Sequence, residues 1–268
     1  MLRFCIHSIV TELAFCALAP LLSAQTGMSP ALPPSIPNLS GVWDNTHLDL
    51  HRGGPSEGPP GGFVGPGDIP TFGFTREEPE MLPWAKERYS AARYDLPRGL
   101  LDRGKDALDP IHSCFPPGPT RAFTNPSPWE LFQFPDAVVL LFEFDHQVRR
   151  IYVDGRGHPA GFAPSWMGHS IGRYDGDSLL ADTVKPSPRT WLDAMGHPQT
   201  ESLRISERFR LSDPDTLQID FTFDDPETYV RPWTGKKIFL RAPPRFEVLE
   251  STLCEEWLEM GTHHGGGD

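Results

Sequence analysis

From Trp129 onward, apolar and polar residues alternate in short runs that are separated by turn-forming residues. Alternation with a period of two is typical of strands that bury one face. Asp175-Gly176 and Asp213-Pro214 fall between such runs and predict antiparallel hairpins, the first with a type I′ turn. Consecutive hairpins predict a mainly β fold, either a single antiparallel barrel or a strongly curved sheet, because closure removes exposed strand edges. The runs predicted as strands are 129–134, 138–144, 147–154, 169–174, 177–183, 203–211, 216–223, 236–241 and 246–250, with 41–43 as a candidate early strand.

The first half of the chain has a different composition, because 18 of the 30 prolines and 13 of the 25 glycines lie in residues 26–128. Proline and glycine disfavour regular elements, so we expect an extended N-terminal wrap with one short helix over residues 77–93. Pro83 either starts or breaks that helix, and Trp84, Tyr89 and Ala92 are candidates for its buried face. The predicted organisation is a signal peptide in 1–24, the N-terminal wrap in 25–128, the β core in 129–256 and a flexible tail in 257–268.

The first residues have the pattern of a signal peptide. Arg3 supplies a positive charge, an apolar stretch covers residues 13–22, and an acceptable cleavage site lies near Ala24. We therefore expect an exported protein, periplasmic or secreted after cleavage near Ala24. Cys114 and Cys254 then remain in an oxidising compartment and are expected to form a disulfide, the alternative being two unpaired buried thiols.

Charge and missing motifs exclude several classes of function. The formal net charge of −12 disfavours binding to nucleic acids and to anionic membrane surfaces, and the N-terminal apolar stretch is too short for a stable membrane span. The sequence has no Walker loop, dinucleotide-binding glycine motif, serine-hydrolase elbow or Cys-x-x-Cys motif. His158, His169 and His197 lack the spacing of a metal site. We therefore predict a small-molecule ligand or substrate, with no cofactor and no metal.

Two charged residues fall on predicted inward faces of strands. Glu207 alternates with apolar neighbours in the run 203–211, and Arg149 does so in the run 147–154. A buried carboxylate needs either a partner or a raised pKa, so Glu207 is a candidate general acid or base. The alternative is a structural ion pair between Glu207 and Arg149, and Arg149 is also a candidate for binding a substrate carboxylate.

A second catalytic candidate comes from the hairpin at Asp175-Gly176. A two-residue turn there sets His169 opposite Asp182, and a carboxylate beside an imidazole fixes its tautomer and raises its basicity. The alternative is a polar pair at the rim of the sheet. The loop 154–159 adds His158 as a further catalytic candidate. Substrate binding is assigned to Arg149, Arg156, Trp166, Tyr174 and Trp233.

Four motifs stand out: GHSIGRYDGDSL at 168–179, ERF at 207–209, DDP at 224–226 and YVRPWT at 229–234. With residues 114–119 and 154–159, they resemble a largely uncharacterised family of exported proteins from soil-dwelling and related bacteria. The resemblance covers roughly residues 37–256. It implies export and one β-rich domain, and it implies no particular reaction. Relatives often carry Trp at the position of Tyr174, and some carry Asp at that of His169, which favours Glu207, Arg156 and His158 as site residues.

Inward polar groups beside a barrel cavity favour an exported acid/base enzyme, a lyase, hydratase or isomerase that acts on a small organic or carbohydrate-derived molecule. That hypothesis expects Glu207, His158 and His169 to line one cavity. The alternative is a non-catalytic, lipocalin-like protein that binds an apolar small molecule inside the barrel. A third hypothesis is an interaction protein whose N-terminal wrap docks a partner. The residues assigned to the apolar ligand are Trp129, Phe142, Phe209 and Phe221.

Overall fold

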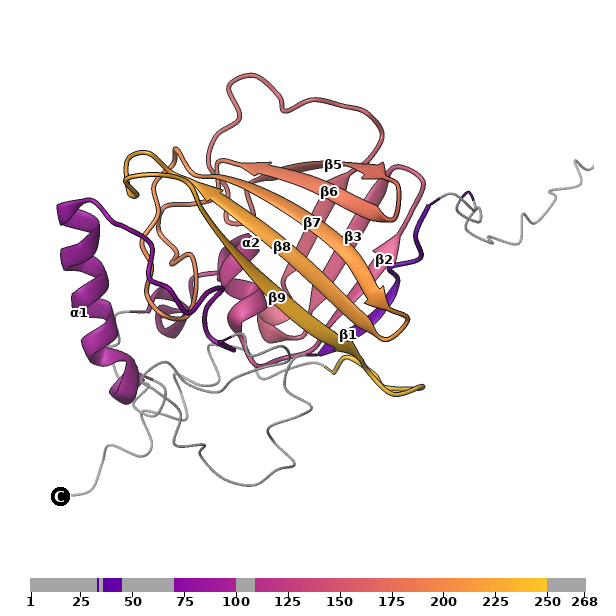
Figure 1. Ribbon diagram of the computed structural model, residues 1–268, viewed down its shortest axis with the longest axis horizontal. Coiled ribbons are helices and arrows are strands. Elements are labelled where there is room, and N and C mark those ends of the chain that lie inside the picture. Colours follow the sequence, from indigo (N-terminus) through magenta and orange to yellow (C-terminus); the bar gives the residue numbers. More distant parts are fainter. Residues whose placement is uncertain (1–32, 34–35, 45–69, 100–108, 250–268) are drawn as a thin grey trace, which may run out of the picture. The chain divides into compact units, whose positions relative to one another are not determined.

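The computed structural model describes residues 33, 36–44, 70–99 and 109–249, which belong to one compact unit. Nine strands in this part form a closed barrel in their order along the sequence, so the predicted fold class is confirmed (Figure 1). The first strand pairs with both the second and the ninth, and this pairing closes the barrel. The strands are β1 (Gly41–Asp44), β2 (Trp129–Gln133), β3 (Ala137–Phe142), β4 (Val148–Tyr152), β5 (His169–Asp175), β6 (Ser178–Val184), β7 (Arg204–Asp213), β8 (Thr216–Asp224) and β9 (Trp233–Arg241).

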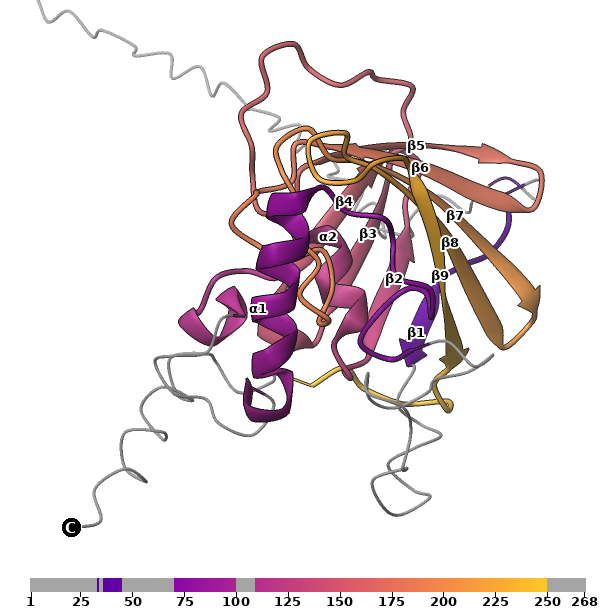
Figure 2. The same ribbon diagram turned by 60° about the vertical axis from the view of Figure 1, so that its left-hand side comes forward.

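Two predictions about the strands are wrong. β4 and β5 pair in parallel at Ile151↔Ser170, whereas antiparallel pairing was expected throughout. A tight turn cannot join parallel strands, so residues 153–168 form a long crossover, which projects beyond the strand ends in both views (Figures 1 and 2). The strand expected at 246–250 is not formed at 246–249, where Phe246 instead donates its backbone N–H to the Pro243 carbonyl in a turn.

The helix predicted over residues 77–93 is α1, which covers Pro83–Gly99. It starts at the proline, so residues 77–82 are not helical, and it runs six residues beyond the predicted end. Proline suits the first helical position because its missing N–H has no intrahelical partner there. Among the side chains described, those over residues 83–92, the buried ones are Ala85, Tyr89 and Ala92, which follow helical spacing. Trp84 is five residues from Tyr89 and is 40% exposed, so its assignment to that face was wrong.

The N-terminal wrap also fills the barrel. α2 (Gly118–Arg121) and η3 (Ala122–Thr124) carry the buried ring of Phe123 into the core. Its centroid lies 5.1–6.5 Å from those of five other aromatic rings that strands contribute, mostly in edge-on or tilted contacts favoured by aromatic pairs. With β1 in the barrel wall, the wrap and the β core form one structural unit. The five rings are those of Trp129, Phe142, Phe209, Phe221 and Phe239.

A buried lysine holds the segment before α1 against the barrel. Lys237 of β9 donates from Nζ to the carbonyls of Pro70, Thr71 and Gly73. Burial lowers the pKa of Lys237 to about 7, and the Asp193 carboxylate opposes part of this shift. The three carbonyl acceptors therefore place one end of the N-terminal wrap along β9.

Several predictions concern residues outside the described part of the chain. The signal peptide, parts of the N-terminal wrap, Cys254 and the tail lie there, so export and the Cys114–Cys254 disulfide stay predictions. Within the described residues, no helix combines the length and apolar character that a membrane crossing requires.

Candidate functional site

The turn between β5 and β6 sets which residues oppose each other. Asp175 pairs with Ser178, so the two-residue turn is Gly176-Asp177 and not Asp175-Gly176. Gly176 has φ +57° at the first central position, the place of glycine in a type II′ turn and not of the expected type I′ turn. Asp182 consequently pairs with Ile171, and the direct His169–Asp182 pairing was wrong.

His158 nevertheless connects His169 to Asp182. This imidazole comes from the 153–168 crossover, and its Nε2 lies 3.0 Å from Oδ2 of Asp182. Its Nδ1 lies 2.8 Å from Nδ1 of His169. Three of the four predicted catalytic residues therefore form one hydrogen-bonded chain, Asp182–His158–His169, on the outer face of the barrel.

The direction of each hydrogen bond follows from the charge of Asp182. Burial opposes its ionisation, but hydrogen bonds from Arg204 and His158 outweigh that effect, and the pKa of Asp182 is lowered. An ionised carboxylate only accepts, so Nε2 of His158 carries a proton and Nδ1 of a neutral His158 accepts from His169. Nε2 of His169 is then left without a proton and is the basic end of the chain.

The surroundings keep His169 neutral and oriented. Burial, with added repulsion from His158 and Arg156, lowers the pKa of His169. Its ring stacks on Tyr152 at a centroid distance of 5.6 Å, and Phe162 packs edge-on at 5.3 Å. Arg156 lies over the Tyr152 ring at 3.9 Å. The imidazole is thus packed against two aromatic rings, one of which also carries the Arg156 guanidinium.

We expect NMR titration to give His169 a pKa below the ordinary value of about 6.5, with 15N shifts that place its proton on Nδ1. Because the folded-state pKa lies below the unfolded value, protonation favours the unfolded chain. The stability linked to His169 is therefore complete above about pH 6.5 and is lost as the pH falls through the folded-state pKa. Arg156→Gln should raise the midpoint, and a wild-type midpoint above about 6.5 would contradict the arrangement.

A cleft of about 1120 Å³ begins at Asp182, at one end of the hydrogen-bonded series, and lies over the outward face of β5 to β9. Asp182 and Arg204 line it, as do Arg156 on one side and Arg76 on the other. Arg204 donates from Nε and Nη2 to the two carboxylate oxygens of Asp182, each at 2.7 Å. A ligand in this cleft lies next to the carboxylate that orients the histidines.

Glu207 and Arg149 lie on the opposite face of the sheet. They form an ion pair inside the barrel with side-chain exposures of 0% and 1%. Arg149 also donates to Thr183 at 2.8 Å and to Ser170 at 3.3 Å. Glu207 borders the floor of the cleft, but its carboxylate points to Arg149. The expected common cavity with His158 and His169 is therefore not formed, and the contacts favour the structural ion pair.

The remaining binding candidates are dispersed. Trp166 stacks on Phe115 at 5.5 Å. Tyr174 accepts a hydrogen bond from Gln133 at 3.0 Å, and Trp233 packs on Phe223 at 4.3 Å. Of the five residues assigned to substrate binding, the structure brings Arg156 alone to the cleft beside Asp182.

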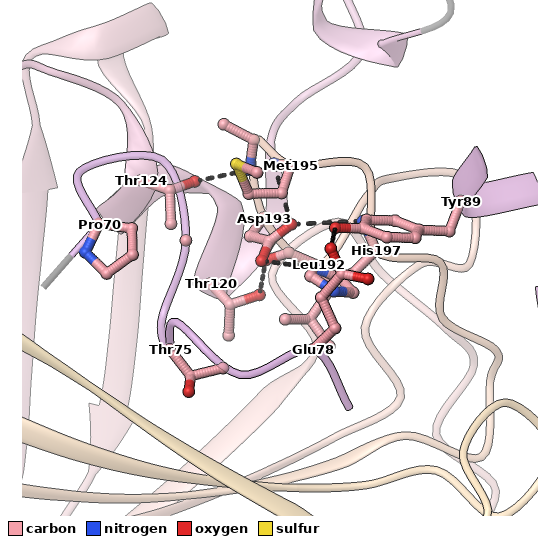
Figure 3. Close-up of polar contacts among 12 residues, drawn as sticks. Pro70, Thr75, Glu78, Tyr89, Thr120, Thr124, Leu192, Asp193, Met195 and His197 are labelled. Carbon is pink, nitrogen blue, oxygen red and sulfur yellow. Dashed lines mark hydrogen bonds and ion pairs between the residues drawn. The ribbon is translucent and has the colours of Figure 1, made fainter. Parts of the chain in front are cut away.

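A second His–Asp pair was missed as a site, because Asp193 lies in a loop without strand periodicity. Asp193 accepts from Nδ1 of His197 at 2.8 Å and from the backbone N–H of Met195 at 3.0 Å (Figure 3). Tyr89 of α1 stacks on His197 at 4.4 Å and donates to Glu78. The side chains of His197 and Asp193 are only 6% and 1% exposed, so this pair fixes its loop against α1 and is closed to a substrate.

His197 is thus separate from the His158–His169 pair. Among the described residues, no group of three or more His, Cys, Asp or Glu side chains is arranged to hold a metal. Arg204 is the functional residue of the outer site that sequence reasoning missed. Its alternation with the inward-facing Ile205 and Glu207 placed Arg204 on the outer face, and this was the signal by which it could have been found.

Comparison with known proteins gives no family, since no family model and no curated protein matches the chain.

Proposed function

We propose that the protein is an acid/base enzyme, a lyase, hydratase or isomerase, whose base is Nε2 of His169. The substrate is a small organic or carbohydrate-derived molecule bound in the outer cleft. The single observation that carries the proposal is the series of hydrogen bonds from Asp182 through His158 to His169, which leaves Nε2 of His169 unprotonated and begins at a carboxylate that lines a large cleft. A base with a pKa below neutrality is in its active form at neutral pH.

The proposed proton transfer uses only the three hydrogen-bonded side chains Asp182, His158 and His169. Nε2 of His169 takes a proton from a carbon next to a carboxylate or carbonyl group, and the electron pair of the C–H bond stays on the substrate. The proton on Nδ1 of His169 passes to Nδ1 of His158, and Asp182 stabilises the resulting imidazolium. Arg156 stabilises the negative charge that develops on the substrate. If the proton returns to another carbon of the substrate, the reaction is an isomerisation. If it goes to a departing hydroxide, water is released and the reaction is a dehydration.

The binding-protein alternative is less well supported. It needs space for an apolar ligand among four aromatic rings, and each of these rings lies within 6.5 Å of the centroid of Phe123. A core packed to ordinary protein density leaves no room for a small-molecule ligand among these rings.

The proposal also retains export and the Cys114–Cys254 disulfide, which rest on the sequence.

Exchange of carbon-bound protons with solvent tests the proposed base. The protein is incubated in D2O with hydroxy acids, aldonic acids and uronic acids, and loss of the C–H signal is followed by proton NMR. We expect catalysed exchange at the carbon next to the carboxylate, reduced about 100-fold or more by His169→Gln because general base catalysis contributes on that order. Asp182→Asn should reduce exchange less, because it disturbs the base without removing it.

Arg150→Gln is the matched control. Arg150 is an exposed residue of β4 that does not line the cleft, so its exchange rate should equal that of the wild type. Equal rates in the wild type and a folded His169→Gln variant would contradict the assignment of the base. Absence of exchange from every acid tested would contradict acid/base chemistry on this class of substrate.

A further inference from the structure

A row of hydroxyl side chains crosses the floor of the outer cleft. Ser206 of β7, Thr222 of β8 and Thr234 of β9 pair directly across the three strands. On its other side Ser206 pairs with Asp182 of β6. The row therefore begins at the carboxylate that holds His158 and ends at the edge of β9.

These hydroxyls are available to a ligand. Ser206 and Thr234 are exposed and Thr222 is half-buried, and the described residues offer none of the three side chains a hydrogen-bond partner. Neighbouring strands are about 4.8 Å apart, so the hydroxyls recur at that interval. This interval is comparable to the length that one sugar ring adds to an extended chain.

The sides of the cleft are basic in an otherwise acidic protein. Outward-facing residues that line it include six basic side chains but only two acidic ones, Asp182 and Asp220, although the chain has a net charge of −12. Arg208 and Lys236 lie two residues further along their strands than Ser206 and Thr234. Each pairs with Asp220, which lies between them on β8. Arg156 and Arg204 are closely paired with Asp154 and Asp182, at 2.5 and 2.7 Å. Arg173 and Arg208 are exposed and only loosely paired, at 3.8 and 3.7 Å, so these two side chains and Lys236 are the ones that can attract an anion to the cleft. The basic residues are Arg76, Arg156, Arg173, Arg204, Arg208 and Lys236.

We propose that the outer cleft binds an extended carboxylate-bearing oligosaccharide along the hydroxyl row. The carboxylates of its inner sugars lie toward Arg208 and Lys236, and its end sugar lies past Asp182 with its carboxylate toward His169. Sugar hydroxyls match the serine and threonine row, and carboxylates match guanidinium and ammonium groups. A single-stranded nucleic acid fits less well, because base stacking needs exposed rings and the two rings that line the cleft, Phe74 and Phe221, are buried. The inference deepens the proposed function and rests on it, since it names the class of its substrate.

Binding of oligogalacturonate, a linear chain of uronic acids, tests the inference by isothermal titration calorimetry with the His169→Gln variant. This variant lacks the proposed base but keeps every residue of the hydroxyl row, so binding is measured without turnover. We expect binding that weakens with salt and that Arg208→Gln and Lys236→Gln each weaken about tenfold. The double variant Thr222→Val/Thr234→Val keeps the shape of both side chains, loses both hydroxyls and should also weaken binding.

The controls separate this inference from the proposed base. Arg150→Gln should bind as the starting variant does, while a neutral chain of glucose units and an oligothymidylate should bind at least tenfold more weakly. Equal binding of any of these chains, or no effect of Arg208→Gln and Lys236→Gln, overturns the inference. If oligogalacturonate binds as described but the wild type exchanges no carbon-bound protons, the inference stands and the proposed function fails. If small acids exchange but the oligosaccharide does not bind, the reverse holds.

Discussion

Replacing Glu207 with leucine is expected to lower the free energy of unfolding by about 3–5 kcal/mol, because Arg149 would remain charged inside the barrel without a counter-ion. Ser170 and Thr183 would still accept hydrogen bonds from the guanidinium, but neither carries a charge. Urea denaturation followed by tryptophan fluorescence measures the loss. A change below about 1 kcal/mol would contradict the buried ion pair.

The double variant Arg149→Met/Glu207→Leu is the matched test of cause. It removes both charges and should recover most of the stability, because two apolar side chains in the barrel carry no desolvation cost. Glu201→Gln, which breaks the exposed 4.0 Å pair with Lys185, should change stability by less than about 1 kcal/mol. The double variant should also keep its proton exchange, because the proposed base lies on the other face of the sheet. Loss of proton exchange in a stably folded double variant would mean that Glu207 is a catalytic residue after all.

Replacing Phe123 with alanine is expected to cost about 3–5 kcal/mol, because the ring is 1% exposed and its removal leaves a cavity among five aromatic rings. The same denaturation experiment measures the loss. Phe134→Ala removes the same group from a side chain that is 37% exposed and should cost far less. A cost for Phe123→Ala no larger than that for Phe134→Ala would show that the ring is not packed.

The cavity of Phe123→Ala also separates the packed barrel from a ligand-binding barrel. An apolar cavity of this kind binds small aromatic molecules, so benzene should raise the Tm of Phe123→Ala and leave that of the wild type unchanged. A similar rise in the wild type would mean that the native barrel already has room for an apolar ligand. That result would favour the lipocalin-like alternative.

The β architecture could be predicted from the sequence because strand alternation is a local signal. Eight of the runs beyond residue 128 coincide with β2 to β9 to within a few residues, and alternation placed Glu207 and Arg149 on one inner face. The parallel pairing of β4 with β5 has no local signal, because it depends on the path of the 153–168 crossover. The filling of the barrel by Phe123 was missed for the same reason, since Phe123 lies in a Pro-rich segment without periodicity.

The candidate site shows how far local reasoning extends. His169 and Asp182 were identified from the expected hairpin register and His158 from its loop, but the link through His158 was not predicted. The turn at Gly176-Asp177 shifts the register by two residues from the expected one, which alone would have separated His169 from Asp182. The crossover brings His158 into the gap and restores the link through a second imidazole.

The sequence by itself determined the mainly β barrel, the inward position of Glu207 and Arg149, and the histidines and carboxylate of the outer site, because alternation and residue chemistry are carried by neighbouring residues. Tertiary structure alone decided which groups meet. Pairing register, crossover path and the docking of the N-terminal wrap are set by contacts between residues far apart in the chain. They put the ion pair inside the barrel and the histidines outside it, and they moved the candidate site from the barrel interior to its outer face.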